Sequence, residues 1–233
     1  MPTIGSIPAY QFRVDSRFPT DRENQLGYVN LAYSLDYSDS PLEAHIARTG
    51  ANAISSSERV QESVQDYGAA VEYPNFPLAN SLKTVAQLMS GGLGTRVYYV
   101  SFGGFDTHSA EAATQSRLLG GFSASVGAFL EDVAAMGMSD RVLLMTFSEF
   151  GRRVQENGSL GTDHGTAGPM FIIGDRVRGG LYGEHPSMTV LDANRNLRYG
   201  VDFRSVYGTV LDGWLGADQK LVLGAKYENV GFV

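Results

Sequence analysis

The order of three segments constrains the fold of this chain most strongly. Two short runs, residues 97–102 and 142–147, have the β-branched and aromatic composition of buried strands, and between them apolar residues recur at helical spacing from Leu118 to Val133. Strands separated by a long helix are typical of a parallel pair with a right-handed crossover. Residues 169–173 resemble a third strand. The sequence therefore predicts an α/β fold with a mostly parallel sheet flanked by helices.

Further patterns predict helices on either side of this region. Ser40 followed by Pro41 predicts the start of a helix that runs to about Tyr67, with an interruption near Gly50 or residues 55–57. Residues 78–89 have helical apolar spacing, and Asp202 is expected to cap a last helix. Residues 1–40 lack sustained periodicity. We expect them to be an irregular covering segment of one domain that spans residues 1–233.

Composition and charge exclude several classes of function. The formal net charge is -7 and no dense run of Lys or Arg is present, which argues against a nucleic-acid partner. No apolar run approaches the length of a membrane span, and the first thirty residues lack a secretory signal. Because the chain has no cysteine, a metal site must be built from His, Asp, Glu and hydroxyl groups. The oligomeric state stays open.

Three polar clusters beside the predicted strands carry the candidate chemistry. The first contains Asp106 and His108, the second Ser148 and Glu149, and the third Asp163 and His164. Together they supply carboxylates, imidazoles and a hydroxyl. Oxygen and imidazole ligands suit a hard or borderline divalent ion. In open parallel sheets, ligands bind beyond the carboxyl ends of the strands, where two of the clusters fall. The sequence thus predicts a metal site for ester chemistry. Its expected ligands are Asp106, His108, Glu149 and His164, with Ser148 and Asp163 as additional candidates.

Each cluster also has a structural interpretation. The first can belong to the cap of the helix that follows it, because Asp and Ser are favoured at such positions. Glu149 can be the ion-pair partner of Arg152 at helical spacing. The third cluster can satisfy the backbone of a turn, and the pair Arg152 and Arg153 can be a solvated face. Residues 157–159 match a glycosylation sequon, but Asn-Gly is first a turn signal, and we interpret it as a turn.

Four segments of this sequence resemble a known family. They are Gly-Gly-Phe-Asp-Thr-His at 103–108, Thr-Phe-Ser-Glu-Phe-Gly-Arg-Arg at 146–153, residues 161–169, and Gly-Gly-Leu-Tyr-Gly at 179–183. In this order they are similar to the DUF1501 family, from about Pro77 to the C-terminus. That bacterial family is grouped with the alkaline phosphatase and sulfatase superfamily. The resemblance implies an alkaline-phosphatase-like α/β fold and a two-metal ester hydrolase.

The resemblance also implies roles for the polar residues. Asp106 and His108 resemble the Asp and His ligands that follow a sheet strand in the superfamily, and His164 resembles its late histidine. Glu149 falls where a following strand normally delivers an Asp-His pair. The implied metal is zinc, with calcium or manganese as the alternatives.

The implied function is metal-dependent hydrolysis of a small anionic ester of phosphate or sulfate. Arg152 or Arg153 is expected to hold two substrate oxygens in a planar fork. Superfamily enzymes place a Ser or Thr nucleophile after an early strand, and this sequence shows no such segment. We therefore expect a fold that is incomplete at the N-terminus, as in the C-terminal part of a longer protein or a shortened relative. The alternative is a non-catalytic binding or assembly member. The family resemblance implies a periplasmic or secreted location, although this chain carries no signal peptide.

Overall fold

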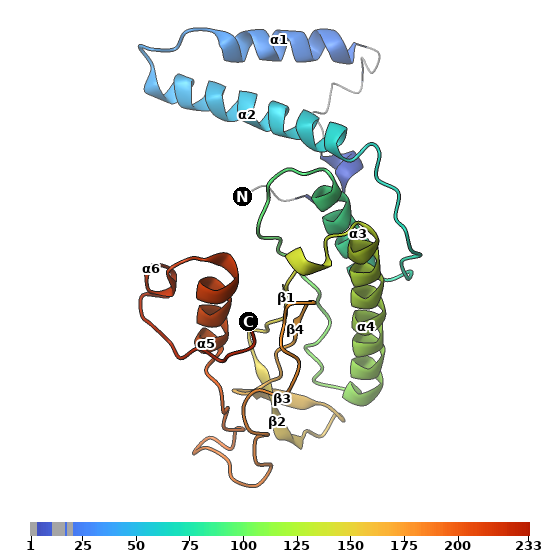
Figure 1. Cartoon of the computed structure of the whole chain (residues 1–233), viewed down its shortest axis with the longest axis vertical. Coiled ribbons are helices and arrows are strands. Elements are labelled where there is room, and N and C mark those ends of the chain that lie inside the picture. The colour runs from blue at the N-terminus through green and yellow to red at the C-terminus, as the bar shows by residue number, and fades with distance from the viewer. Residues whose placement is uncertain (1–3, 11–16, 18–20) are drawn as a thin grey trace. The chain divides into compact units, whose positions relative to one another are not determined.

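The computed structural model describes residues 4–10, 17 and 21–233, which form two compact units. Unit 1 comprises residues 1–102 and 124–132, and unit 2 comprises residues 103–123 and 133–233. Both units take residues from the long helix α4 (Glu111–Ala135), which is drawn in yellow-green in Figure 1. The parts of residues 1–40 that lie at 1–3, 11–16 and 18–20 are outside the described residues.

The described part of unit 1 is helical. Its elements are η1 (Ile7–Ala9), α1 (Arg22–Ser34), α2 (Pro41–Ser63) and α3 (Pro77–Ser90). Helix α2 begins with Pro41, whose missing N–H is harmless in the first turn. It runs unbroken through Gly50, where the ring of Tyr33 on α1 occupies the space that a side chain would need. Helices α1 and α2 therefore lie side by side (Figure 1). The predicted interruption is wrong, and the segment expected to be irregular contains α1.

The apolar spacing of α3 is confirmed by burial. Of the five positions at helical spacing, four are buried and Met89 is partly buried; the buried four are Leu78, Leu82, Val85 and Leu88. Leu88 packs in a cluster with Ile7, Val60 and Val64. Because removing aliphatic side chains from water is the main favourable term in folding, this cluster holds η1, α2 and α3 together.

The sheets of unit 2 contradict the predicted parallel sheet. Strand β1 (Leu144–Met145) pairs antiparallel with β4 (Ile172–Ile173), and β2 (Gly151–Glu156) pairs antiparallel with β3 (Thr162–Gly165). A hairpin rather than a helix connects β1 to β4, so no crossover is present between them. Residues 97–102 form neither helix nor strand. The composition of these segments therefore predicted neither which strand each one pairs with nor whether the pairing is parallel or antiparallel.

Helix α4 confirms the predicted long helix. Four of its apolar positions are buried: Leu118, Val126, Phe129 and Val133. By length and composition alone, α4 could cross a membrane, and 39% of its most apolar window is buried within the structure. Core helices of globular proteins pass the same test, so the expected absence of a membrane span stays a prediction.

The C-terminal part of unit 2 is again helical. It contains α5 (Phe203–Thr209), the π-helical turn η3 (Val210–Leu215) and α6 (Gln219–Leu223), and a short turn η2 (Ser139–Arg141) follows α4. The carboxylate of Asp202 accepts a hydrogen bond of 2.9 Å from the backbone N–H of Arg204. This contact satisfies one of the free donors at the start of α5 and confirms the predicted cap.

Candidate metal centre

A buried threonine anchors the first pair of candidate ligands. Thr107 is buried, and its hydroxyl accepts a hydrogen bond of 3.1 Å from the side-chain amide of Gln115 on α4. Its two neighbours remain accessible, since the side chains of Asp106 and His108 are 61% and 48% exposed. The loop before α4 is thus fixed to the helix through Thr107, while a carboxylate and an imidazole stay open to solvent.

The hairpin β2–β3 delivers the second imidazole. His164 on β3 pairs with Arg152 on β2, and the next residue is Gly165, where a Cβ atom would lie 2.6 Å from the Arg152 carbonyl oxygen. Only glycine allows the strands to approach this closely. The ring of Phe150 stacks on the imidazole of His164, with 3.9 Å between ring centres and an angle of 3° between planes. This stacking fixes the orientation of His164.

The turn of the hairpin is clamped to the loop that carries His108. The Asn157 side chain donates to the His108 carbonyl (3.0 Å) and accepts from the backbone N–H groups of Ser159 (2.9 Å) and Gly161 (3.1 Å). Gly161 lies directly against the His108 backbone, where a Cβ atom has no space. The predicted Asn-Gly turn is confirmed. Its contact with the His108 loop was not predicted, because the residues involved are about fifty positions apart.

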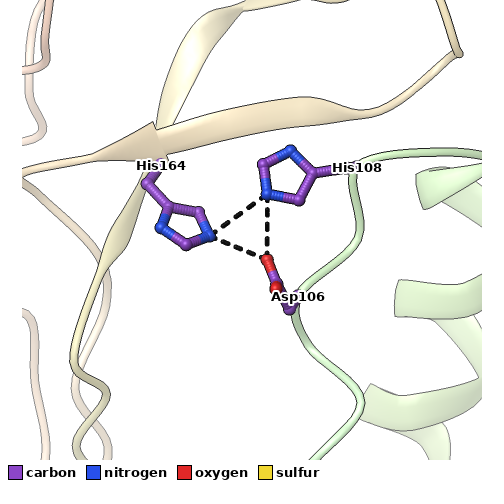
Figure 2. Close-up of side chains that lie close together, drawn as sticks. All are labelled: Asp106, His108 and His164. Atoms are coloured by element: carbon purple, nitrogen blue, oxygen red, sulfur yellow. Dashed lines mark hydrogen bonds and ion pairs between the residues drawn. The ribbon is translucent and has the colours of Figure 1, made fainter.

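Three ligand atoms converge between the loop and the hairpin (Figure 2). Asp106 Oδ1 lies 2.7 Å from His164 Nε2 and 3.1 Å from His108 Nε2, and the two Nε2 atoms are 3.3 Å apart. Neighbouring ligands of a tetrahedral zinc ion with bonds of about 2.0–2.1 Å are about 3.3 Å apart. The three atoms are therefore spaced so that Asp106, His108 and His164 could hold one small divalent ion between them. The residues present therefore fit a divalent ion that keeps at least one position open.

The electrostatics of the cluster keep its carboxylate ionised. The pKa of Asp106 is lowered, chiefly by the hydrogen bond from His164. Desolvation opposes this shift, and the charges of His108, His164 and Arg152 lower the pKa further. An ionised carboxylate is the form that binds a metal. Asp106 is thus ready to act as an anionic ligand at neutral pH.

Arg152 supports the site from inside the protein. Its guanidinium donates to the carbonyl oxygens of Phe105 and Thr162, and it lies 3.7 Å from the carboxylate of Asp106 and 3.9 Å from that of Glu111. The Arg152 side chain is only 20% exposed. These contacts join the loop to the hairpin. They do not match the solvated face considered from the sequence, and its carboxylate neighbours are Asp106 and Glu111.

The structure brings together some of the predicted metal ligands. Among the described residues, the converging group contains Asp106, His108 and His164. Glu149 does not belong to this group, and its exposed carboxylate accepts a hydrogen bond of 3.3 Å from the hydroxyl of Ser148. The expectation that Glu149 joins the others depended on strands ending at one edge of a parallel sheet.

The other two predicted residues lie along the hairpin. Asp163 Oδ1 is 3.3 Å from Nδ1 of His108, so Asp163 contacts a candidate ligand. Arg153 donates from Nε to the carbonyl of His164 at 3.2 Å. The predicted role of the two arginines in substrate binding stays a prediction.

Comparisons with known proteins place the chain in a family. No curated protein matches it, and no solved structure matches it. The family model described as "Protein of unknown function (DUF1501)" matches residues 31–224, a span that includes every predicted site residue. The sequence resemblance, which begins near Pro77, is thereby confirmed and extended toward the N-terminus. This chain belongs to the DUF1501 family.

Proposed function

We propose that this chain binds one divalent metal ion through Asp106, His108 and His164 and uses it to hydrolyse esters of phosphate or sulfate. The convergence of one carboxylate oxygen and two imidazole nitrogens, all within 4.8 Å of one another, carries the proposal. Two imidazoles with one carboxylate favour zinc, since calcium takes six to eight oxygen ligands and manganese also prefers oxygen.

The protein groups of the centre suit hydrolytic chemistry. Three protein ligands leave room for water or substrate, and the ligand side chains are 47–61% exposed, so a substrate can reach them. A divalent ion in this position supplies Lewis acidity, which polarises an ester oxygen and lowers the pKa of a water molecule. His108 and His164 supply neutral nitrogen ligands, and Asp106 balances part of the positive charge.

The ester class is supported by sequence motifs. The four segments resemble the DUF1501 family, which is grouped with the alkaline phosphatase and sulfatase superfamily, whose substrates are phosphate and sulfate esters. The antiparallel strands of unit 2 add no support to that grouping. Because three ligands converge, we propose a centre for one ion rather than two. A periplasmic or secreted location is part of the same proposal.

Metal analysis combined with turnover of generic aryl esters tests this function. Purified protein exchanged into zinc should hold about one ion per chain and cleave an aryl phosphate or an aryl sulfate. Chelation and His164→Ala should remove both properties, and zinc should restore activity to the chelated wild type. His45→Ala, on the exposed surface of α2, is the matched control and should behave as wild type. If wild type holds no metal and leaves both esters intact, the proposed function is wrong.

A non-catalytic binding or assembly role is the second candidate. Arg152, which the sequence predicts to hold substrate, instead donates to two backbone carbonyls of its own chain. With Arg152 held by these carbonyls, the centre is suited to holding an ion or a ligand without cleaving an ester. Zinc binding without cleavage of either ester would support this second role and exclude the hydrolase.

A further inference from the structure

The ring of His108 contacts strand β3 through both of its nitrogens. Its Nε2 lies 3.1 Å from Asp106 Oδ1 and 3.3 Å from His164 Nε2, within the converging group, and its Nδ1 lies 3.3 Å from Asp163 Oδ1. Consecutive residues of β3 therefore contact two different atoms of one imidazole.

The protonation pattern of that ring decides whether His108 can bind a metal. A neutral imidazole carries one proton, and only the nitrogen without it offers a lone pair. The nitrogen that carries the proton is selected by its hydrogen-bond partner. An ionised carboxylate only accepts hydrogen bonds, so Asp163 beside Nδ1 and Asp106 beside Nε2 compete for the proton of the ring. When Nε2 binds an ion, the proton must lie on Nδ1, beside Asp163.

We propose that Asp163 is a positioning residue that holds His108 in the Nδ1–H tautomer and thereby presents its Nε2 lone pair to the metal. This inference rests on the proposed metal centre. Asp163 does not belong to the converging group of the described residues, so it acts through His108 rather than as a further ligand. Metal-binding histidines generally donate their second N–H to a carboxylate or carbonyl, and loss of that partner weakens metal binding 10–100-fold.

The hairpin keeps Asp163 in place. His164 is paired with Arg152 across the two strands, and Arg153 donates to the His164 carbonyl at 3.2 Å. The position of β3 relative to the His108 loop is set by the clamp from Asn157, which donates to the His108 carbonyl. Asp163 and His108 therefore meet because the backbone of both segments is fixed, even though both side chains are partly exposed.

The first test measures the tautomer of His108 in the metal-free protein. Long-range 1H–15N NMR at a pH above the pKa of free histidine reports which nitrogen carries the proton. The chain has only four histidines, so His→Gln variants assign every signal. Wild type and Asp163→Asn, which keeps an acceptor oxygen, should show a larger fraction of the Nδ1–H form of His108 than Asp163→Ala, in which Asp106 no longer has a competitor for the ring proton. The His45 and His185 signals should stay unchanged.

The second test measures zinc affinity by competition with a chromogenic chelator. Asp163→Ala should bind zinc 10–100-fold more weakly than wild type, and Asp163→Asn should recover most of the loss. Asp175→Ala, an exposed aspartate beyond β4, is the matched control and should bind as wild type. Equal affinity and equal tautomer in Asp163→Ala and wild type would overturn the inference. Absence of zinc binding to wild type would instead overturn the proposed metal centre, and the tautomer measurement would still test the contact between Asp163 and His108.

Discussion

Two aspartates of this chain show how different the surroundings of a carboxylate can be. Asp132 on α4 is fully buried, and its oxygens accept hydrogen bonds from the hydroxyls of Tyr67 (2.5 Å) and Tyr73 (2.9 Å) and from the backbone N–H of Ala70 (3.0 Å). Asp106 is 61% exposed, and one of its oxygens faces the Nε2 atoms of two histidines.

The difference lies in what each set of neighbours can do. Around Asp132, every neighbour is a donor, so the carboxylate is satisfied within unit 1 and has a structural role. Around Asp106, the neighbours are imidazole nitrogens, which can act as acceptors or ligands themselves. Two imidazoles and a carboxylate that all point at one place are best satisfied by a cation. Convergence of groups with lone pairs, rather than the presence of a carboxylate, therefore distinguishes a candidate site from a buried contact.

The largest expected effect is the loss of stability that follows replacement of the buried aspartate, Asp132. Asp132→Ala removes the acceptor of two hydroxyls and one N–H, and each unsatisfied buried donor costs about 1–3 kcal/mol, so we expect a loss of about 3–5 kcal/mol in the free energy of unfolding. Urea unfolding with chelator present measures this loss. The exposed neighbour variant Glu131→Ala should lose little. A small loss for Asp132→Ala would show that this contact is not structural.

A smaller loss in the free energy of unfolding is expected where the turn of the β2–β3 hairpin contacts the loop that carries His108. Gly161→Ala places a methyl group against the His108 backbone, and overpacking of this kind costs about 1–3 kcal/mol. The same shift moves His108, so zinc affinity should fall as well. Gly158→Ala in the same turn meets no atom within 4 Å and is the matched control. Equal zinc affinity in Gly161→Ala and Gly158→Ala would show that the turn does not position the ligands of the metal centre.

Alkaline pH should destabilise the contacts of the buried aspartate, Asp132, with Tyr67 and Tyr73. Burial, followed by the hydrogen bonds to Asp132, raises the pKa of Tyr67 and Tyr73 in the folded protein. Their contribution to stability is complete below the unfolded pKa of about 10 and is lost as pH rises toward the higher folded pKa. The free energy of unfolding should therefore fall above about pH 10. Urea midpoints measured across this range should fall less steeply in Tyr67→Phe, and identical slopes would contradict the assignment.

The smallest effect on stability is expected for Asp106→Ala. Because Asp106 is exposed and its partners can turn to water, its loss should leave the unfolding midpoint of the metal-free protein unchanged. Added zinc should raise the midpoint of wild type, since an ion that binds only the folded state stabilises it, but not that of the variant. Thermal unfolding with and without zinc measures both. A large loss of stability in the metal-free variant would assign Asp106 a structural role like that of Asp132.

Several local patterns in the sequence predicted local structure, although the interruption expected in α2 is absent and residues 97–102 form no strand. The spacing of Leu78, Leu82 and Val85 predicted α3, and Asp202 predicted the cap of α5, because helical periodicity and capping depend on neighbours within a few residues. Strand pairing depends on partners far along the chain. The runs at 142–147 and 169–173 were therefore identifiable as strand segments, but their antiparallel pairing through β1 and β4 was not.

The same distinction explains the candidate site. Residue types pointed to Asp106, His108 and His164, since imidazoles and carboxylates beside glycines are typical of ligands. Glu149 was grouped with them by an expected parallel sheet that is absent from the described structure. The sequence around Asn157 predicted a turn, but it did not indicate that the Asn157 side chain donates to the His108 carbonyl. The burial of Asp132 could not be predicted from the sequence, because a single carboxylate in an amphipathic helix is normally exposed.

Zinc titration of the wild type and four variants tests the central claim most directly. Wild type and Glu149→Ala should each bind one zinc ion with the same dissociation constant, because Glu149 lies outside the converging group. Asp106→Ala, His108→Ala and His164→Ala should each bind at least about 100-fold more weakly, since each removes one of three ligands. Equal binding by all five proteins, or no binding by wild type, would contradict a metal centre at these three residues.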